Sequence, residues 1–141
     1  THRDYHSRNL LIKEERVRVI DFQDALMGPP VYDLASLLRD SYMELDETLI
    51  DNLIKYYIER RRETEGVIIE REGFRRIFDI MSVQRNMKAV GRFVYINEVK
   101  KNSSYLKYIP CTLGYIKGNL QKYKELYILH RILSRYVGEI A

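Results

Sequence analysis

The sequence predicts a mainly α-helical fold with one short β-hairpin, of the α+β class. Two short apolar runs, at residues 10–12 and 17–20, flank a charged turn, which is typical of a hairpin. Beyond residue 33, apolar side chains recur at three- to four-residue spacing, which indicates amphipathic helices. The chain has 141 residues, of which 45% are hydrophobic and 31% charged. These proportions predict a single domain, residues 1–141, with enough apolar material for a core.

The expected helices cover residues 33–42, 47–64, 70–95, 105–123 and 124–137. Asp33 stands where the N-cap of the first helix is expected, and Gly66 follows the second. Pro110 and Gly118 mark expected breaks within the range 105–123. No internal repeat or low-complexity segment interrupts this pattern.

Charge, hydropathy and cysteine content argue against a nucleic-acid partner, a membrane partner and a disulfide framework. The net charge is +4, but acidic residues are interspersed with basic ones, so we expect no nucleic-acid partner. No apolar run approaches the ~20 residues of a membrane span, so no membrane partner is expected either. The single cysteine, Cys111, excludes an internal disulfide framework and fits a reducing cytoplasm.

The most informative stretch lies at residues 2–33. It contains H-R-D at 2–4, Asn9 after four further residues, and a D-F pair at 21–22. Phosphoryl transfer needs a carboxylate that orients and deprotonates an acceptor hydroxyl, together with oxygen ligands for magnesium. This pattern supplies both in the order found in kinases.

The hairpin explains the spacing of the oxygen ligands. Asp4 and Asn9 are five positions apart, so on a helix they would face different ways, and we expect an irregular loop instead. In the hairpin, Asn9 should lie nearly opposite Ile20 or Asp21, because paired residues are only ~5 Å apart. A carboxamide and a carboxylate would then meet at one spot that suits magnesium.

These motifs resemble the aminoglycoside phosphotransferase and choline kinase superfamily, the small-molecule branch of the protein-kinase-like fold. His6 stands two residues after Asp4, where this branch often has histidine, and P-V-Y-D-L-A at 30–35 replaces the A-P-E of protein kinases. Within the branch, R-D-Y-H-S-R-N-L at 3–10 and D-F-Q-D-A at 21–25 look most like bacterial N-acetylmuramate/N-acetylglucosamine kinases. The resemblance is strong over about the first 42 residues and looser beyond them.

The resemblance implies ATP and Mg2+ as cofactors and a role for each motif residue. Asp4 would be the catalytic base, and Asn9 and Asp21 would hold the nucleotide-bound magnesium. His2 would brace the catalytic loop, and Asp33 would anchor the loop that follows.

Three further residues are candidates for contact with substrate or phosphate. His6 matches the branch, and Arg8 carries a permanent, fork-shaped charge that could equally form a structural ion pair. Asp24 matches no position shared across the superfamily. Gln23 departs from the pattern, because it replaces the glycine of D-F-G and makes a protein-kinase-like flip of this segment doubtful.

The first residue is Thr1, and no glycine-rich phosphate loop occurs in the chain. We therefore expect the C-terminal lobe of a kinase without its nucleotide lobe, inactive alone and prone to self-association through uncovered apolar surface. The expected function of the full-length protein is phosphorylation of a hydroxyl on a small molecule, in particular an amino sugar.

Three alternatives stay open. The acceptor could be an aminoglycoside or a choline-type alcohol, or the chain could be a catalytically silent binding or scaffold module. The side chains of His2, Asp4 and His6 could instead form a transition-metal cluster.

Overall fold

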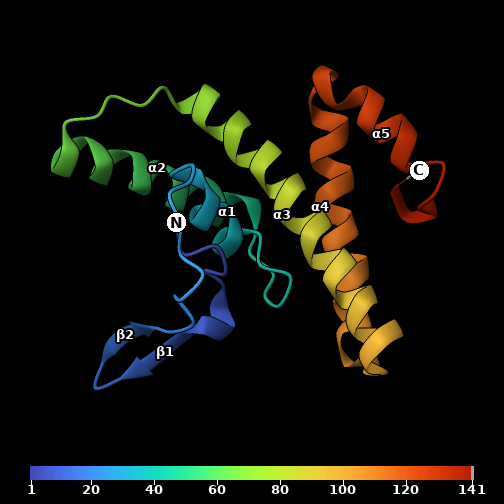
Figure 1. Ribbon diagram of the computed structural model, residues 1–141. Coiled ribbons are helices and arrows are strands. Elements are labelled where there is room, and N and C mark those ends of the chain that lie inside the picture. The colour runs from blue at the N-terminus through green and yellow to red at the C-terminus, as the bar shows by residue number, and fades with distance from the viewer. Residues whose placement is uncertain (141) are drawn as a thin grey trace. The chain divides into compact units, whose positions relative to one another are not determined.

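The computed structural model describes residues 1–140 and confirms a mainly helical fold with one two-stranded antiparallel hairpin (Figure 1). The chain divides into two compact units, Thr1–Asp79 and a second that begins at Ile80, where the composition predicted one domain. The division falls inside the long helix α3 (Arg71–Lys100). Among residues 1–140, no helix combines the length and the apolar character that crossing a bilayer requires.

The hairpin pairs β1 (Leu10–Lys13) with β2 (Arg16–Val19) in the register Leu10 opposite Val19. Its two-residue turn consists of Glu14 and Glu15, both at positive φ (52° and 58°), as in the tight turns that match strand twist. The usual Asn-Gly signal is absent, so the two short apolar runs and the short charged turn between them define this hairpin. The pairing of the two strands fixes the position of Asn9, directly before β1, relative to Ile20 and Asp21, directly after β2.

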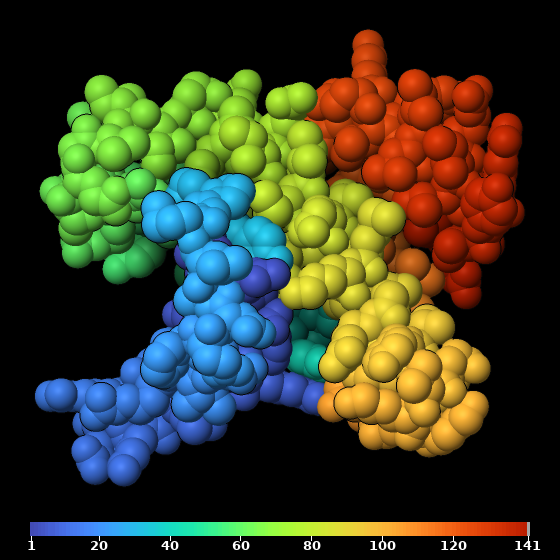
Figure 2. Space-filling model, in the orientation of Figure 1, coloured from blue at the N-terminus to red at the C-terminus, as the bar shows by residue number. Residues whose placement is uncertain are grey.

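One face of the hairpin is apolar and largely uncovered. Ile12 is 84% exposed and its cross-strand partner Val17 63% exposed. In Figure 2 the hairpin stands clear of the rest of the first unit. Backbone pairing and the hydrogen bonds at its base therefore hold the hairpin, rather than packing within the described unit.

The core of the first unit comes from α1 (Val31–Leu38), α2 (Glu47–Glu65) and the start of α3. The Asp46 side chain caps α2 by accepting from the Leu49 amide (2.8 Å), and Gly66 ends it at φ 67°. These signals explain why the observed helix agrees closely with the expected range 47–64. The buried apolar side chains of this unit are Val31, Ala35, Leu38, Ile50, Ile54, Phe74 and Phe78.

Helix α1 differs from the prediction at both ends. It begins at Val31 with Pro30 as N-cap, and it ends at Leu38 rather than at residue 42. The predicted N-cap role of Asp33 is wrong, because Asp33 lies inside the first turn and its carboxylate bonds elsewhere. Proline suits this end of a helix, since it lacks an amide that would need a partner.

The second unit contains the rest of α3, which extends beyond the predicted end at residue 95 to Lys100. The two final helices predicted at 105–123 and 124–137 are broken into shorter pieces. These are the 3-10 turn η2 (Ser103–Tyr108), α4 (Ile109–Lys122), η3 (Lys124–Leu126), α5 (Tyr127–Leu133) and η4 (Gly138–Ile140).

Of the two predicted breaks, the one at Pro110 is observed, where η2 ends and α4 begins, and the one at Gly118 is not. Pro110 occupies the first turn, where its missing amide costs nothing, and Gly118 lies within the helix. The core of this unit consists of Val83, Leu113, Ile116, Leu120 and Ile140.

An ion network joins the elements of the first unit. Arg75 pairs with Asp79 one turn along α3 (3.0 Å) and with Glu47 on α2 (2.9 Å), and Asp79 is fully buried. Arg75 also contacts Asp51, and Glu47 pairs with the buried Arg39 at 2.6 Å. A buried carboxylate needs such partners, so this network constrains how α2 and the start of α3 pack.

Arg75→Met tests this network. It removes one partner of the buried Asp79 carboxylate, and we expect the free energy of unfolding to fall by about 3 kcal/mol. As a matched control, Arg60→Met breaks the exposed pair with Glu63 (2.6 Å) and should cost about 0.5 kcal/mol or less. Urea denaturation measures both, and equal costs would contradict a structural role for Arg75.

Acid should weaken the same network through Glu47. Burial alone would raise the pKa of Glu47, but the hydrogen bonds and charges of Arg75 and Arg39 outweigh it and lower that pKa below its ordinary 4.5. The contribution of Glu47 is thus present above about pH 4.5 and lost as pH falls through the lower folded value. The stability difference between wild type and Glu47→Gln should shrink below this pH, and a difference that grows there would contradict the assignment.

Candidate active site

The carboxylate of Asp33 holds the start of the H-R-D segment. Its two oxygens accept from the His2 amide (2.6 Å) and the Arg3 amide (3.0 Å). Asp33 belongs to α1, so a rigid helix holds this loop through the backbone amides of the loop. Its hydrogen bonds run to the segment before the hairpin, whereas the resemblance assigned it to the loop that follows.

His2 joins this loop to the base of the hairpin, where β2 ends. Its Nε2 lies 2.9 Å from the carbonyl oxygen of Ile20, which can only accept, so Nε2 carries the proton in this contact. The imidazole also packs edge-on against Tyr5, with ring centroids 5.7 Å apart. Because Ile20 directly precedes Asp21, His2 positions the backbone next to the predicted magnesium ligand.

Asn9 closes the loop on itself. Its carboxamide nitrogen donates to the Asp4 carbonyl (2.9 Å), and its backbone carbonyl accepts from the Ile20 amide (3.1 Å). The second bond confirms that Asn9 lies opposite Ile20. The nitrogen of the Asn9 side chain is turned toward Asp4. Its oxygen, Oδ1, accepts no hydrogen bond from residues 1–140 and is available as a metal ligand.

Asp21 lies directly beyond the hairpin with φ at 66°, in the left-handed region that non-glycine residues seldom adopt. Its Oδ1 accepts from the Gln23 side chain at 2.6 Å. Within the described chain no hydrogen bond engages the other oxygen, Oδ2. Gln23 therefore does more than replace a glycine, because it orients the carboxylate.

The side-chain oxygens Oδ1 of Asn9 and Oδ2 of Asp21 fit magnesium, which prefers oxygen ligands and retains several waters. These residues would hold the ion together with phosphate oxygens of a nucleotide. The alternative transition-metal cluster of His2, Asp4 and His6 is not formed. Within residues 1–140, no three histidine, cysteine, aspartate or glutamate side chains come together as a metal site.

Asp4 lies between the two anchored ends of the loop and is half-buried. Its carbonyl accepts from the His6 amide (3.1 Å) as well as from the Asn9 side chain. The preceding residue, Arg3, has φ at 74°, a second left-handed position at this site. Such residues cost on the order of 1–3 kcal/mol and cluster at functional sites, which fits the predicted role of this loop.

The three candidate contact residues lie in two places. His6 and Arg8 both contact the ring of Tyr42: the His6 ring packs edge-on at 5.4 Å, and the Arg8 guanidinium lies over the face at 3.8 Å. Asp24 is exposed, and its carbonyl lies 3.4 Å from the Arg3 guanidinium. Their contacts with substrate or phosphate stay predictions.

The sequence analysis missed Asp40 and Tyr42. Asp40 is only 3% exposed, and it accepts from the Ser7 amide (2.8 Å) and the Tyr42 amide (2.9 Å). In the sequence Asp40 follows an apolar stripe and cannot be distinguished from a solvated carboxylate at a helix end. The short Asp-x-Tyr spacing indicated at most a local turn.

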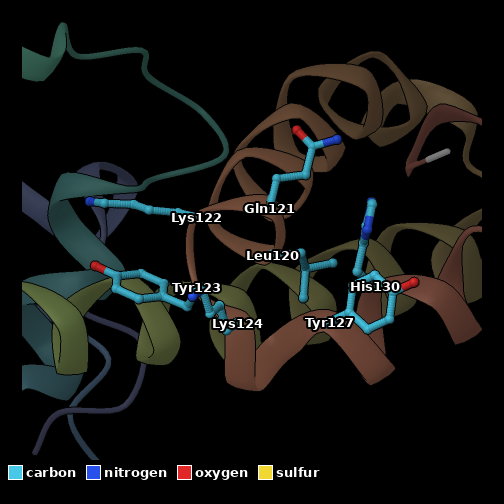
Figure 3. Close-up of a pocket in the computed structure, with 7 residues that line it drawn as sticks. All are labelled: Leu120, Gln121, Lys122, Tyr123, Lys124, Tyr127 and His130. Carbon is cyan, nitrogen blue, oxygen red and sulfur yellow. The ribbon is translucent and has the colours of Figure 1, made fainter.

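A separate pocket of about 600 Å³ lies in the second unit, and it contains none of the predicted site residues. Figure 3 shows Lys122 and Tyr123 extending to one side of it, and Tyr127 and His130 lying together on the other. His130 bonds to the Ile140 carbonyl (3.0 Å), which holds η4 against α5. The polar groups do not converge on one point, so the pocket does not compete with the loop as the candidate site.

The anchored loop, the hairpin and the oxygen atoms of Asn9 and Asp21 agree with the arrangement that the sequence predicted for the catalytic segment of a phosphotransferase. Residues 1–67 match the model of the Phosphotransferase enzyme family.

Almost the whole chain is similar to curated kinases. It is 38% identical over 139 residues to "N-acetylmuramate/N-acetylglucosamine kinase" of Neisseria meningitidis, covering 98% of this chain and 42% of that protein. Proteins of the same name from Pseudomonas aeruginosa and Pseudomonas putida are 33% and 31% identical over 135 residues, covering 94% of the chain and 40% of each relative. The chain thus spans about two fifths of the length of these relatives.

Gln23→Leu tests how the magnesium site is oriented. Loss of the hydrogen bond to Oδ1 should free the Asp21 carboxylate to rotate and raise the Mg2+ concentration for half-maximal phosphotransfer about tenfold. The measurement uses full-length protein, with Gln121→Leu on α4 as a matched exposed glutamine. An unchanged Mg2+ requirement in Gln23→Leu would remove Gln23 from the site.

Proposed function

We propose that the full-length protein is an ATP- and Mg2+-dependent phosphotransferase that phosphorylates a hydroxyl group of an amino sugar. The observation that carries the proposal is the hydrogen bond from the Asn9 carboxamide to the Asp4 carbonyl, made while Asn9 pairs with Ile20 across the hairpin. The Asn9 side chain thus lies beside the Asp4 backbone, and Asp21 directly follows Ile20, which supports a shared role for Asp4, Asn9 and Asp21.

Asp4 acts as the base. Its carboxylate orients the acceptor hydroxyl and takes its proton as the bond to phosphorus forms. The segment carrying Asp4 is anchored by Asp33 on one side and by Asn9 on the other, so little reorganisation is needed when substrate binds.

Asn9 and Asp21 bind the nucleotide through its metal. When bound, magnesium neutralises the charge that develops on the phosphate oxygens. Asn9 contributes Oδ1, while its nitrogen stays bonded to Asp4. Asp21 contributes Oδ2, while Oδ1 stays bonded to Gln23. Each of the two side chains therefore has one atom held by a hydrogen bond and one oxygen that would serve as a ligand of the ion.

The amino-sugar acceptor is inferred from the relatives, which are named as N-acetylmuramate/N-acetylglucosamine kinases. Similarity extends over 98% of the chain for the Neisseria protein, including the helices beyond the catalytic segment. An aminoglycoside or choline-type acceptor uses the same chemistry at Asp4. A panel of N-acetylmuramate, N-acetylglucosamine, choline and an aminoglycoside separates these acceptors.

Asp4→Asn in full-length protein tests the base. The amide keeps the shape of the side chain but cannot accept the proton, so kcat should fall by about 100-fold or more. Nucleotide affinity, measured by calorimetry with Mg2+-ATP, should change little. Glu59→Gln, on the exposed face of α2, is the control. Wild-type turnover in Asp4→Asn would refute the assignment, and silence of the wild type with every acceptor would favour a binding or scaffold role.

A further inference from the structure

The surface beside the catalytic loop carries a preorganised guanidinium. Arg8 is exposed, and its side chain lies flat over the Tyr42 ring, with the central carbon 3.8 Å from the ring centroid. Stacking on an aromatic face restrains an arginine and keeps its N–H donors at the edge of the plane. Those donors form a fork that matches a carboxylate.

A single buried carboxylate fixes both halves of this arrangement. Asp40 Oδ2 accepts from the amide of Ser7, the residue before Arg8, and Oδ1 accepts from the amide of Tyr42. Asp40 is 3% exposed, so movement of either partner would leave a buried charge with fewer hydrogen bonds. One carboxylate therefore holds the backbone on both sides of the stacked pair.

Arg8 is close in the chain to the residues that we propose act on the acceptor. Arg8 lies in the 3-10 turn η1 (Ser7–Asn9), directly before the ligand Asn9 and four residues after Asp4. A sugar whose hydroxyl meets Asp4 would have its other substituents near this loop, on which Arg8 is an exposed cation. Of the two sugars in the names of the relatives, only N-acetylmuramate carries a carboxylate.

We propose that Arg8, held on Tyr42 by Asp40, binds the carboxylate of an acidic sugar and makes the enzyme prefer it to a neutral amino sugar. The inference rests on the proposed function and adds a specificity-determining residue. It assigns Arg8 to the acceptor rather than to the phosphates of the nucleotide.

The test is the ratio of kcat/KM for N-acetylmuramate to that for N-acetylglucosamine in full-length protein. Arg8→Gln should lower this ratio about tenfold or more, because one charge-assisted hydrogen-bonding pair is lost with the acidic sugar alone. Tyr42→Leu keeps the charge but removes the support, so it should lower the ratio by about threefold. Arg18→Gln removes an exposed charge from the hairpin and should leave the ratio unchanged.

The outcomes are separable. Equal loss with both sugars, or a raised KM for ATP with an unchanged ratio, would overturn the inference, because it would show a structural or phosphate-binding role for Arg8. An unchanged ratio with full activity would overturn it as well. A wild-type protein that turns over neither sugar would instead refute the proposed function.

Discussion

The hydrogen bonds from the His2 and Arg3 amides to Asp33 are the constraint on which the rest of the site depends. They attach an irregular loop to the first turn of α1, an element whose own core residues are buried. From that point the His2 ring reaches the end of the hairpin at Ile20. A helix that is held by packing thus positions a loop and a hairpin that are held mainly by hydrogen bonds.

The same arrangement explains where backbone strain is tolerated. Arg3 and Asp21 both adopt left-handed φ angles, and both lie next to anchored atoms: the Arg3 amide on Asp33 and the Ile20 carbonyl on His2. Hydrogen bonds to the neighbouring backbone offset a cost on the order of 1–3 kcal/mol per residue. The exposed apolar face of the hairpin contributes no comparable packing within the first unit, which makes these polar contacts decisive.

Local signals predicted the parts of the fold that depend on local interactions. Helix α2 was predicted almost to the residue, because its apolar stripe and Gly66 agree on where it lies. The pairing of Asn9 with Ile20 followed from two short strands around a tight turn. The motif pattern also placed Asp4, Asn9 and Asp21 in one segment of the chain.

Long-range interactions account for what the sequence did not predict. The sequence predicted Asp33 as an N-cap, but its carboxylate accepts a hydrogen bond from the amide of Arg3, thirty residues earlier in the chain. Asp40 and Tyr42 contact the catalytic loop from a distant part of the sequence, and local spacing rules do not predict such contacts. The 3-10 turns between and beside the last helices were not predicted, because apolar periodicity does not distinguish α-helix from adjoining 3-10 turns.

The central claim is that Asn9 and Asp21 hold one divalent ion together with nucleotide. The most direct measurement is paramagnetic broadening of amide NMR signals when Mn2+ and ATP are added to isotope-labelled full-length protein. We expect the amides of Asn9, Ile20 and Asp21 to broaden together and most strongly, and that of Lys13, at the far end of the hairpin, to broaden less. Broadening that is scattered over acidic surface residues, or that spares Asn9 and Asp21, would contradict it.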